Sequence, residues 1–123
     1  MEEYGRILHL ALKARWYDMI ESGEKTEEYR EIKPYWVKRL VWDADYGVPV
    51  LHEDIEFICS RPKGIENLFD AGWKPRTYTH VCFRYGYTKR TMLFPIKEIT
   101  IGRGNPAWGA PEDRDVFIIK LNK

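Results

Sequence analysis

The sequence predicts one α+β domain whose sheet curls into a barrel of about five to six strands, with two helices near the N-terminus. The chain has 123 residues, and a domain of that size buries roughly two thirds of its unfolded surface. Helical apolar spacing is confined to the first third of the chain, and strand-like segments follow it. A last apolar run would complete the sheet, and barrel closure would hide the strand edges. We therefore expect a single domain over 1–123.

The first third contains a strand, a helix, an extended segment and a second helix. Segment 8–12 alternates leucine with small or polar residues, which predicts a half-buried strand. Segment 15–22 carries apolar residues at i, i+3 and i+4, which predicts a short helix that Gly23 ends. Segment 26–31 is polar and extended. A second helix is expected over 33–42, with a proline in its first position and an apolar stripe facing the core.

The rest of the chain is predicted to be mostly strand. Acidic residues, a glycine and a proline make 43–53 a loop. Alternating or continuous apolar runs then predict strands at about 54–60, 78–85, 91–101 and 115–121. No internal repeat or linker interrupts this order.

Cysteine, histidine and hydropathy patterns limit the class of protein. Cys59 and Cys82 stand in apolar runs and are interpreted as small buried side chains in a reducing compartment. Their spacing with the three histidines matches no zinc motif, so neither a metal nor another cofactor is expected. The N-terminus lacks a basic segment followed by an apolar run, and no apolar stretch approaches the roughly 20 residues of a membrane span. These patterns predict a cytoplasmic protein without a membrane partner.

The octet from Gly23 to Arg30 is extended yet has no apolar face. Thr26, Glu28 and Arg30 would share one side of a strand, and two acids and a tyrosine would share the other. Charges removed from water must be paired, or each costs roughly several kcal/mol. The octet therefore indicates a polar cleft on which Lys25, Glu28 and Arg30 converge. An edge strand with solvated charges would give the same pattern.

Basic residues are concentrated in the middle of the chain. Residues 74–103 hold seven basic side chains and one acidic side chain, which gives +6, although the whole chain carries only +1. A patch of that sign would attract phosphates within about a Debye length, roughly 8 Å in physiological salt. Two basic hairpin tips without any ligand would give the same count.

Gly23, Lys25, Glu28 and Arg30 match the pattern Gly-x-Lys-x-x-Glu-x-Arg. In this the chain resembles the ASCH domain, a PUA-like β-barrel family. The order of a strand, a short helix, the signature, a second helix and a final strand after a glycine loop is also similar, so the resemblance covers nearly all of 1–123. The resemblance implies a cleft beside the barrel, with RNA or a modified nucleoside as the proposed ligand.

Carried over to this chain, the resemblance makes Lys25, Glu28 and Arg30 the candidate site. Arg30 offers a planar fork for a phosphate or for Glu28, and Lys25 offers a compact charge whose proton affinity its surroundings can shift. Glu28 would hold both cations in place or accept a proton. In the structural alternative, the three side chains form an ion-pair network within a protein-interaction module.

One branch of the family is similar to an amidohydrolase that removes an acetyl group from 4-acetylcytidine with a Lys, a Thr nucleophile and a Glu. In this chain Glu28 stands where the Thr would be, and the nearby hydroxyl belongs to Thr26. Because a carboxylate can activate water, a hydrolase acting on a modified nucleoside or on RNA stays an alternative. Its catalytic residues would be Lys25 and Glu28.

Two further segments supply ligand-binding candidates. The glycine- and proline-rich segment 102–111 contains Arg103, Asn105 and Trp108, and its tryptophan would stack on a base. It would otherwise be a long connection that closes one barrel end. Segment 83–90 interleaves rings with cations, as single-strand binders do, although a hairpin turn at Gly86 explains it equally well. The ligand-binding candidate in this segment is Arg84. A further candidate, Trp16 of the first predicted helix, would line the wall of the cleft.

The sequence thus predicts an ASCH-like domain that binds RNA or a nucleotide-like small molecule. The hydrolase and the protein-interaction module are the alternatives. The ligand's base or modification, the occurrence of catalysis, the oligomeric state and the pathway stay open.

Overall fold

The computed structural model describes residues 6–43, 48–49 and 73–122. Its elements are, in chain order, β1 (Ile7–Leu12), α1 (Ala14–Glu21), β2 (Glu27–Arg30), α2 (Pro34–Leu40), β3 (Val41–Asp43), β4 (Val48–Pro49), β5 (Trp73–Pro75), β6 (His80–Tyr85), β7 (Thr91–Gly102), a 3-10 turn (Pro106–Trp108) and β8 (Val116–Leu121).

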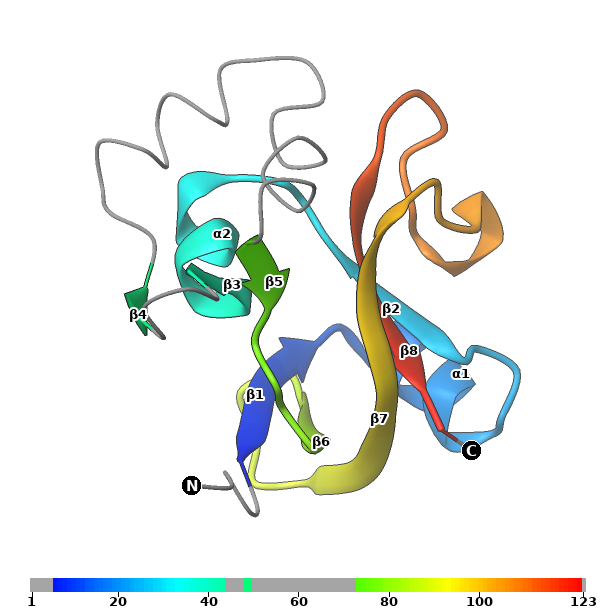
Figure 1. Cartoon of the computed structure of the whole chain (residues 1–123). Coiled ribbons are helices and arrows are strands. Elements are labelled where there is room, and N and C mark those ends of the chain that lie inside the picture. Colours follow the sequence, from blue (N-terminus) through cyan, green and yellow to red (C-terminus); the bar gives the residue numbers. More distant parts are fainter. Residues whose placement is uncertain (1–5, 44–47, 50–72, 123) are drawn as a thin grey trace.

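Five strands form one mixed sheet in the order β1-β6-β7-β8-β2, in which β1 runs parallel to β6 and the other neighbours are antiparallel. The sheet curls because the long strand β7 bends and serves both halves, pairing with β6 in its first part and β8 in its second (Figure 1). A register shift between Ile96 and Glu98 marks this bend, as bulges increase local twist. The predicted α+β domain with a curled sheet is confirmed, as a half-barrel.

The two edge strands of the half-barrel, β1 and β2, are linked through a side chain. Arg30 Nη2 on β2 donates a long hydrogen bond of 3.4 Å to the Ala11 carbonyl on β1. Helix α1 connects the same two strands along the chain. The region around Arg30 is therefore where the sheet comes nearest to closing, and the candidate site lies there.

The main core fills the concave side of the sheet. On β1, Leu8, Leu10 and Leu12 are buried and alternate with exposed residues, which confirms the strand predicted over 8–12. A second, smaller cluster lies on the opposite face of β8 and contains Tyr29, Ala110, Val116 and Ile118. Strand β8 is therefore covered on both faces, and segment 103–115 supplies the outer cover.

Helix α1 confirms the helix predicted over 15–22, and Gly23 follows it with a left-handed φ of 87°. Helix α2 begins at Pro34 as expected but ends at Leu40, short of the predicted boundary. The chain turns extended because β3 pairs with β4 and β5 in a small second sheet. Backbone and side-chain donors from the 76–78 segment satisfy the last helical carbonyls.

The later strands match their predicted positions within two residues, at β6, β7 and β8. The strand predicted over 54–60, and Cys59 within it, lie outside the described residues. Cys82 was expected to be buried, but it is only half-buried because it points to the outer face of β6. The helices among the described residues include none that is long and apolar enough to cross a membrane.

Candidate ligand-binding site

The charged octet leads into β2, which pairs with β8 at the edge of the sheet. The Lys25 amide donates to the Met19 carbonyl at 3.0 Å, which fixes the chain against α1 after the Gly23 turn. Lys25 is 1% exposed and Glu28 is 4% exposed. The alternative of an edge strand with solvated charges is therefore wrong for these two residues, although β2 is an edge strand.

Lys25, Glu28 and Arg30 meet as expected, and we call them the buried network. Lys25 Nζ lies 2.7 Å from Glu28 Oε1, and Arg30 Nη1 pairs with the other oxygen of the same carboxylate. Arg30 Nη1 also donates to the Tyr29 carbonyl at 2.7 Å. Glu28 thus holds both cations, which satisfies the requirement that a buried charge be paired.

Lys25 is enclosed by a carbonyl and by aromatic rings. Its ammonium donates to the Trp108 carbonyl at 2.6 Å and lies 4.4 Å from the centroid of the Trp16 ring. Burial lowers the pKa of Lys25, and the Glu28 carboxylate opposes that shift. The Lys25 ammonium is therefore enclosed by Glu28, the Trp108 carbonyl and the Trp16 ring and is closed to solvent.

Segment 103–115, which we call the covering loop, is fastened over Tyr29. The Asn105 amide donates to the Tyr29 hydroxyl at 3.0 Å, and that hydroxyl donates to Glu27 Oε1 at 2.8 Å. Burial raises the pKa of Tyr29 above its ordinary 10.0. A Cβ on Gly104 would lie 2.6 Å from Tyr29 Cε1, so only glycine allows this approach. Gly109 has a φ of 102° and packs beside the Trp16 ring.

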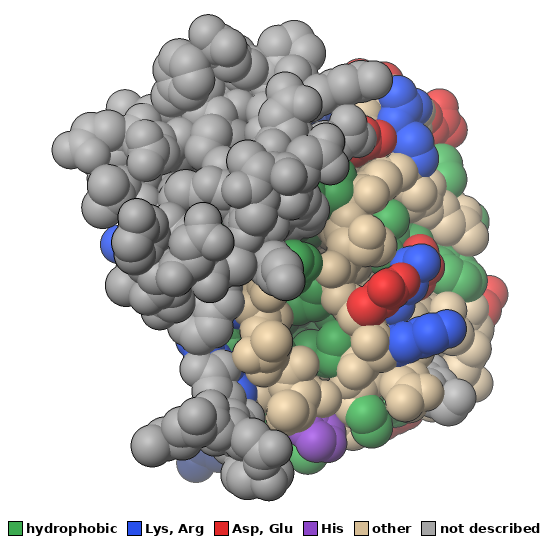
Figure 2. All heavy atoms as spheres, viewed as in Figure 1, with side chains coloured by type: hydrophobic (Ala, Val, Ile, Leu, Met, Phe, Trp, Pro, Cys, Tyr) green, Lys and Arg blue, Asp and Glu red, His purple; other side chains and the backbone are tan. Residues whose placement is uncertain are grey.

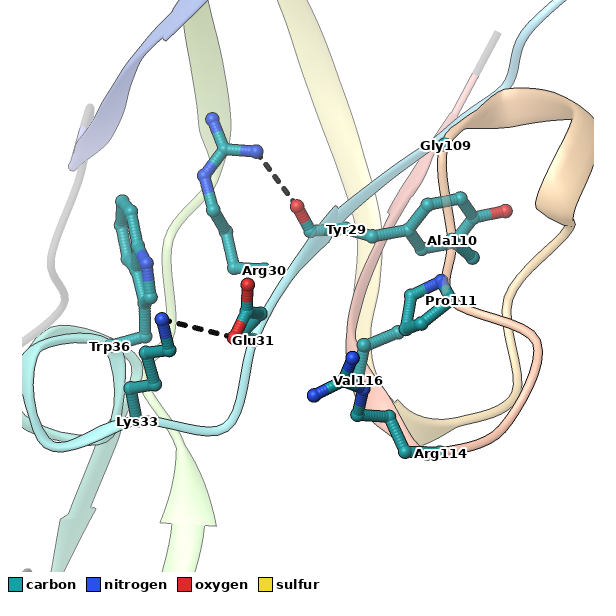
Figure 3. A pocket seen from close by; sticks show the side chains of 10 residues that line it. All are labelled: Tyr29, Arg30, Glu31, Lys33, Trp36, Gly109, Ala110, Pro111, Arg114 and Val116. Carbon is teal, nitrogen blue, oxygen red and sulfur yellow. Dashed lines mark hydrogen bonds and ion pairs between the residues drawn. The ribbon is translucent and has the colours of Figure 1, made fainter.

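A hollow of about 530 Å³ lies between the end of β2, α2 and the covering loop. Figure 3 shows Arg30, Lys33 and Trp36 on one side of it, with Pro111 and Arg114 on the other. Arg30 is the only member of the buried network among the residues that line this hollow. Its guanidinium stands 5.1 Å from the centroid of the Trp36 ring, which fixes the indole at the wall.

The mouth of the hollow carries two exposed ion pairs, which we call the rim pairs. Lys33 Nζ lies 3.1 Å from Glu31 Oε2, and both side chains are more than half exposed. Arg114 Nε lies 3.4 Å from Asp113 Oδ1, and these side chains are 62% and 80% exposed. Pairs of this kind contribute about 0.2–1 kcal/mol each. Lys33 and Arg114 can therefore exchange their carboxylates for another anion at little cost.

The other candidates from the sequence divide into two groups. Trp16 and Trp108 contact the buried network, and the Asn105 side chain accepts from the Ala107 amide at 3.0 Å, which shapes the covering loop. Arg84 lies instead on β6, beside a separate hollow that His9 and Cys82 also line. Arg103 is exposed and pairs with Asp115 at 3.2 Å. The structure does not bring Arg84 or Arg103 to the hollow beside Arg30.

The cations of 74–103 are spread over several elements. Arg90 pairs with Glu21 at 2.9 Å, and Arg76 donates to the Lys38 carbonyl at 2.9 Å. On the face shown in Figure 2, Lys and Arg side chains lie in small groups beside Asp and Glu side chains. Arg76, Arg90 and Arg103 are thus held by separate partners on different elements, and the +6 of this segment is not one cluster of free cations.

Lys33, Trp36 and Arg114 line the hollow but are not among the site residues predicted from the sequence, and neither are Tyr29, Glu31 and Val116. Trp36 belongs to the apolar stripe of the helix predicted over 33–42, and it does pack partly against the core. Lys33 follows the signature by only three residues, so its proximity to Arg30 was the one available signal. Nothing in the sequence near Arg114 pointed to this site.

Comparisons of the chain with protein-family models, with curated proteins and with solved structures find no match.

Proposed function

We propose that this protein is an ASCH-type, PUA-like domain that binds RNA or a nucleotide-like ligand in the hollow beside Arg30. One observation carries the proposal: two exposed cations from separate parts of the chain face one hollow that has an indole in its wall. Cations and an aromatic face are the two groups that single-stranded nucleic acids require of a binding surface.

The anionic part of the ligand would lie on Lys33 and Arg114. Both are already paired, but their rim pairs are exposed and weak, so a phosphate would replace a carboxylate without leaving a buried charge unpaired. Arg114 adds a planar fork that suits phosphate oxygens. The residues that line the hollow include the cations Arg30, Lys33 and Arg114 and the single acid Glu31, so their charge favours an anion.

The base would lie on Trp36. Arg30 lies 5.1 Å from the centroid of this indole and is itself tied to Glu28 and to the Tyr29 carbonyl, so the ring has a fixed neighbour. Lys25 and Glu28 then act as positioning residues that fix Arg30 and the covering loop. The enclosure of Lys25 weighs against the hydrolase, because Lys25 has no open path to a substrate.

Binding can be measured by fluorescence anisotropy with a short labelled single-stranded RNA. We expect Trp36→Ala to raise the Kd by about 5- to 150-fold, the equivalent of about 1–3 kcal/mol of stacking. Arg114→Ala should reduce the slope of log K against log salt by about 0.7, the value for one phosphate contact on a single strand. Arg84→Ala is the matched control, since Arg84 is exposed but lies on β6 away from this hollow.

Unchanged affinity in Trp36→Ala and Arg114→Ala, or an equal loss in Arg84→Ala, would contradict the proposal. The hydrolase predicts something different, namely release of product from an acylated nucleoside that disappears in Lys25→Met. Turnover of this kind would reassign Lys25 from a positioning residue to a catalytic one.

The second candidate function is a protein-interaction module in which the octet is purely structural. The observation that favours it is the complete pairing of Lys25 and Glu28 inside the fold. It predicts that wild-type protein binds no RNA at any salt concentration, which the same anisotropy experiment measures.

A further inference from the structure

Arg30 at the end of β2 and three residues of α2 form a run of rings and cations that begins at the hollow and continues outside it. Arg30 stands 5.1 Å from the centroid of the Trp36 ring, and the Trp36 and Tyr35 centroids are 4.8 Å apart. Arg39 then lies 4.8 Å from the centroid of the Tyr35 ring. We call these four side chains the α2 series.

Tyr35 has no role in the core that would explain its place. It is 57% exposed, whereas its neighbour Trp36 packs partly against the main core. A single exposed aromatic residue is ordinary on a protein surface. Tyr35 differs because it adjoins the indole in the wall of the proposed site and is flanked by an exposed cation.

The same helix presents only positive charge. Residues 32–42 contain Lys33, Lys38 and Arg39 and no acidic residue. All three cations are exposed, with Lys33 at the start of α2 beside the hollow and Lys38 and Arg39 in its last turn. A polyanion that extends from the hollow past Tyr35 would be favoured by this positive charge, with Arg39 nearest to the Tyr35 ring.

We infer that the hollow takes one nucleotide and that Tyr35 takes the next, so that the ligand class is a single-stranded oligonucleotide of at least two nucleotides. This inference rests on the proposed function. The Trp36 and Tyr35 rings are perpendicular, with an interplanar angle of 90°. Two bases on these rings cannot remain stacked on each other, and splayed, unstacked bases are a property of single strands. A duplex would not present its base faces to either ring.

The test compares ligands of one and two nucleotides by titration calorimetry. The probes are the adenylate and uridylate series, each as a 5′-monophosphate and as a 5′-phosphorylated dinucleotide, with a short RNA duplex as a third ligand. For wild-type protein we expect at least one dinucleotide to bind about tenfold more tightly than its mononucleotide, in the range of one added stacking contact.

Variants of Tyr35 identify the second position. Tyr35→Ala should remove the tenfold gain of the dinucleotide over its mononucleotide, and Tyr35→Phe should keep the gain because the ring remains. Tyr87→Ala is the matched control, since Tyr87 is 96% exposed and lies in the turn between β6 and β7. It should alter neither affinity.

The results that would overturn this inference differ from those that would overturn the proposed function. Mononucleotide binding without any gain for dinucleotides, or a gain that survives in Tyr35→Ala, overturns the inference and leaves the proposed function standing. Duplex binding as tight as single-strand binding overturns the single-stranded class. Absence of binding by every mononucleotide and dinucleotide overturns both.

Discussion

Two groups of opposite charges lie within a few residues of each other and behave in opposite ways. In the buried network, the Glu28 side chain is 5% exposed and holds Lys25 and Arg30. In the rim pair three residues later, the Glu31 side chain is 51% exposed and its partner Lys33 is 63% exposed. The residue types are the same, so burial alone separates charges that fix the fold from charges that remain available to a ligand.

The physical basis of this difference is desolvation. A buried charge that loses its partner is left uncompensated, whereas water replaces the partner of an exposed charge. The buried network therefore fixes the hollow's walls, and the rim pairs leave its mouth adaptable. The following predictions test this division of roles.

The largest loss of folding stability is expected from Glu28→Gln. The substitution keeps the shape of the side chain but leaves Lys25 and Arg30 without their shared carboxylate. Breaking a buried pair costs about 3–5 kcal/mol, which urea unfolding would measure. Glu31→Gln is the matched control, and it should lower stability by no more than about 1 kcal/mol, the upper value for an exposed pair. Equal losses in the two variants would remove the distinction between network and rim.

The covering loop closes the buried network, so loosening the loop should be the next largest effect. A Cβ on Gly104 would lie 2.6 Å from both Tyr29 Cε1 and Ala110 Cβ. Overpacking of this kind costs about 1–3 kcal/mol, so Gly104→Ala should lower the unfolding midpoint. In Gly102→Ala the added Cβ would lie 3.6 Å from Ile118 Cδ1, an ordinary contact. A Gly104→Ala variant as stable as Gly102→Ala would show that the loop is not held against Tyr29.

Alkaline pH should weaken the same contact through Tyr29. Burial raises the pKa of Tyr29 above 10.0, so the folded protein keeps a proton that the unfolded chain loses. The stability from this group is complete below pH 10.0 and falls above it, by up to about 1.4 kcal/mol per pH unit. The lowered pKa of Lys25 acts in the opposite direction, since stability rises with pH up to 10.5. The loss of stability due to Tyr29 can therefore be isolated as the difference in the free energy of unfolding between wild type and Tyr29→Phe. A difference that stays constant above pH 10.0 would contradict the prediction.

The features that depend on neighbours in sequence could be predicted. The leucine alternation of β1, the proline at the start of α2 and the convergence of Lys25, Glu28 and Arg30 follow from spacing within a few residues. The end of α2 could not be predicted in this way. Val41 continues the apolar stripe of the helix and is fully buried, but it is buried as the first residue of β3.

The features that depend on distant segments could not be predicted. Arg114 reaches the hollow because β8 pairs with β2, where Lys120 stands opposite Glu27. That register joins segments about 90 residues apart, and no local pattern specifies it. The partner of Lys25 is the backbone carbonyl of Trp108. Because every residue has such a carbonyl, the sequence pointed to the Trp108 ring as a ligand contact and gave no indication of the bond to Lys25.

The smallest expected effect is the loss of the rim pair between Lys33 and Glu31. It gives the most direct comparison with the buried network, because salt should weaken only the rim pair. A double-mutant cycle on Lys33 and Glu31 should give a coupling of about 0.2–1 kcal/mol at low salt. At 1 M salt the Debye length falls to about 3 Å, so this coupling should vanish. The stability difference between wild type and Glu28→Gln should persist at the same salt concentration, because the buried pair is little screened. A rim coupling that survives high salt would mean that Lys33 is held by its carboxylate and is not free to meet a phosphate.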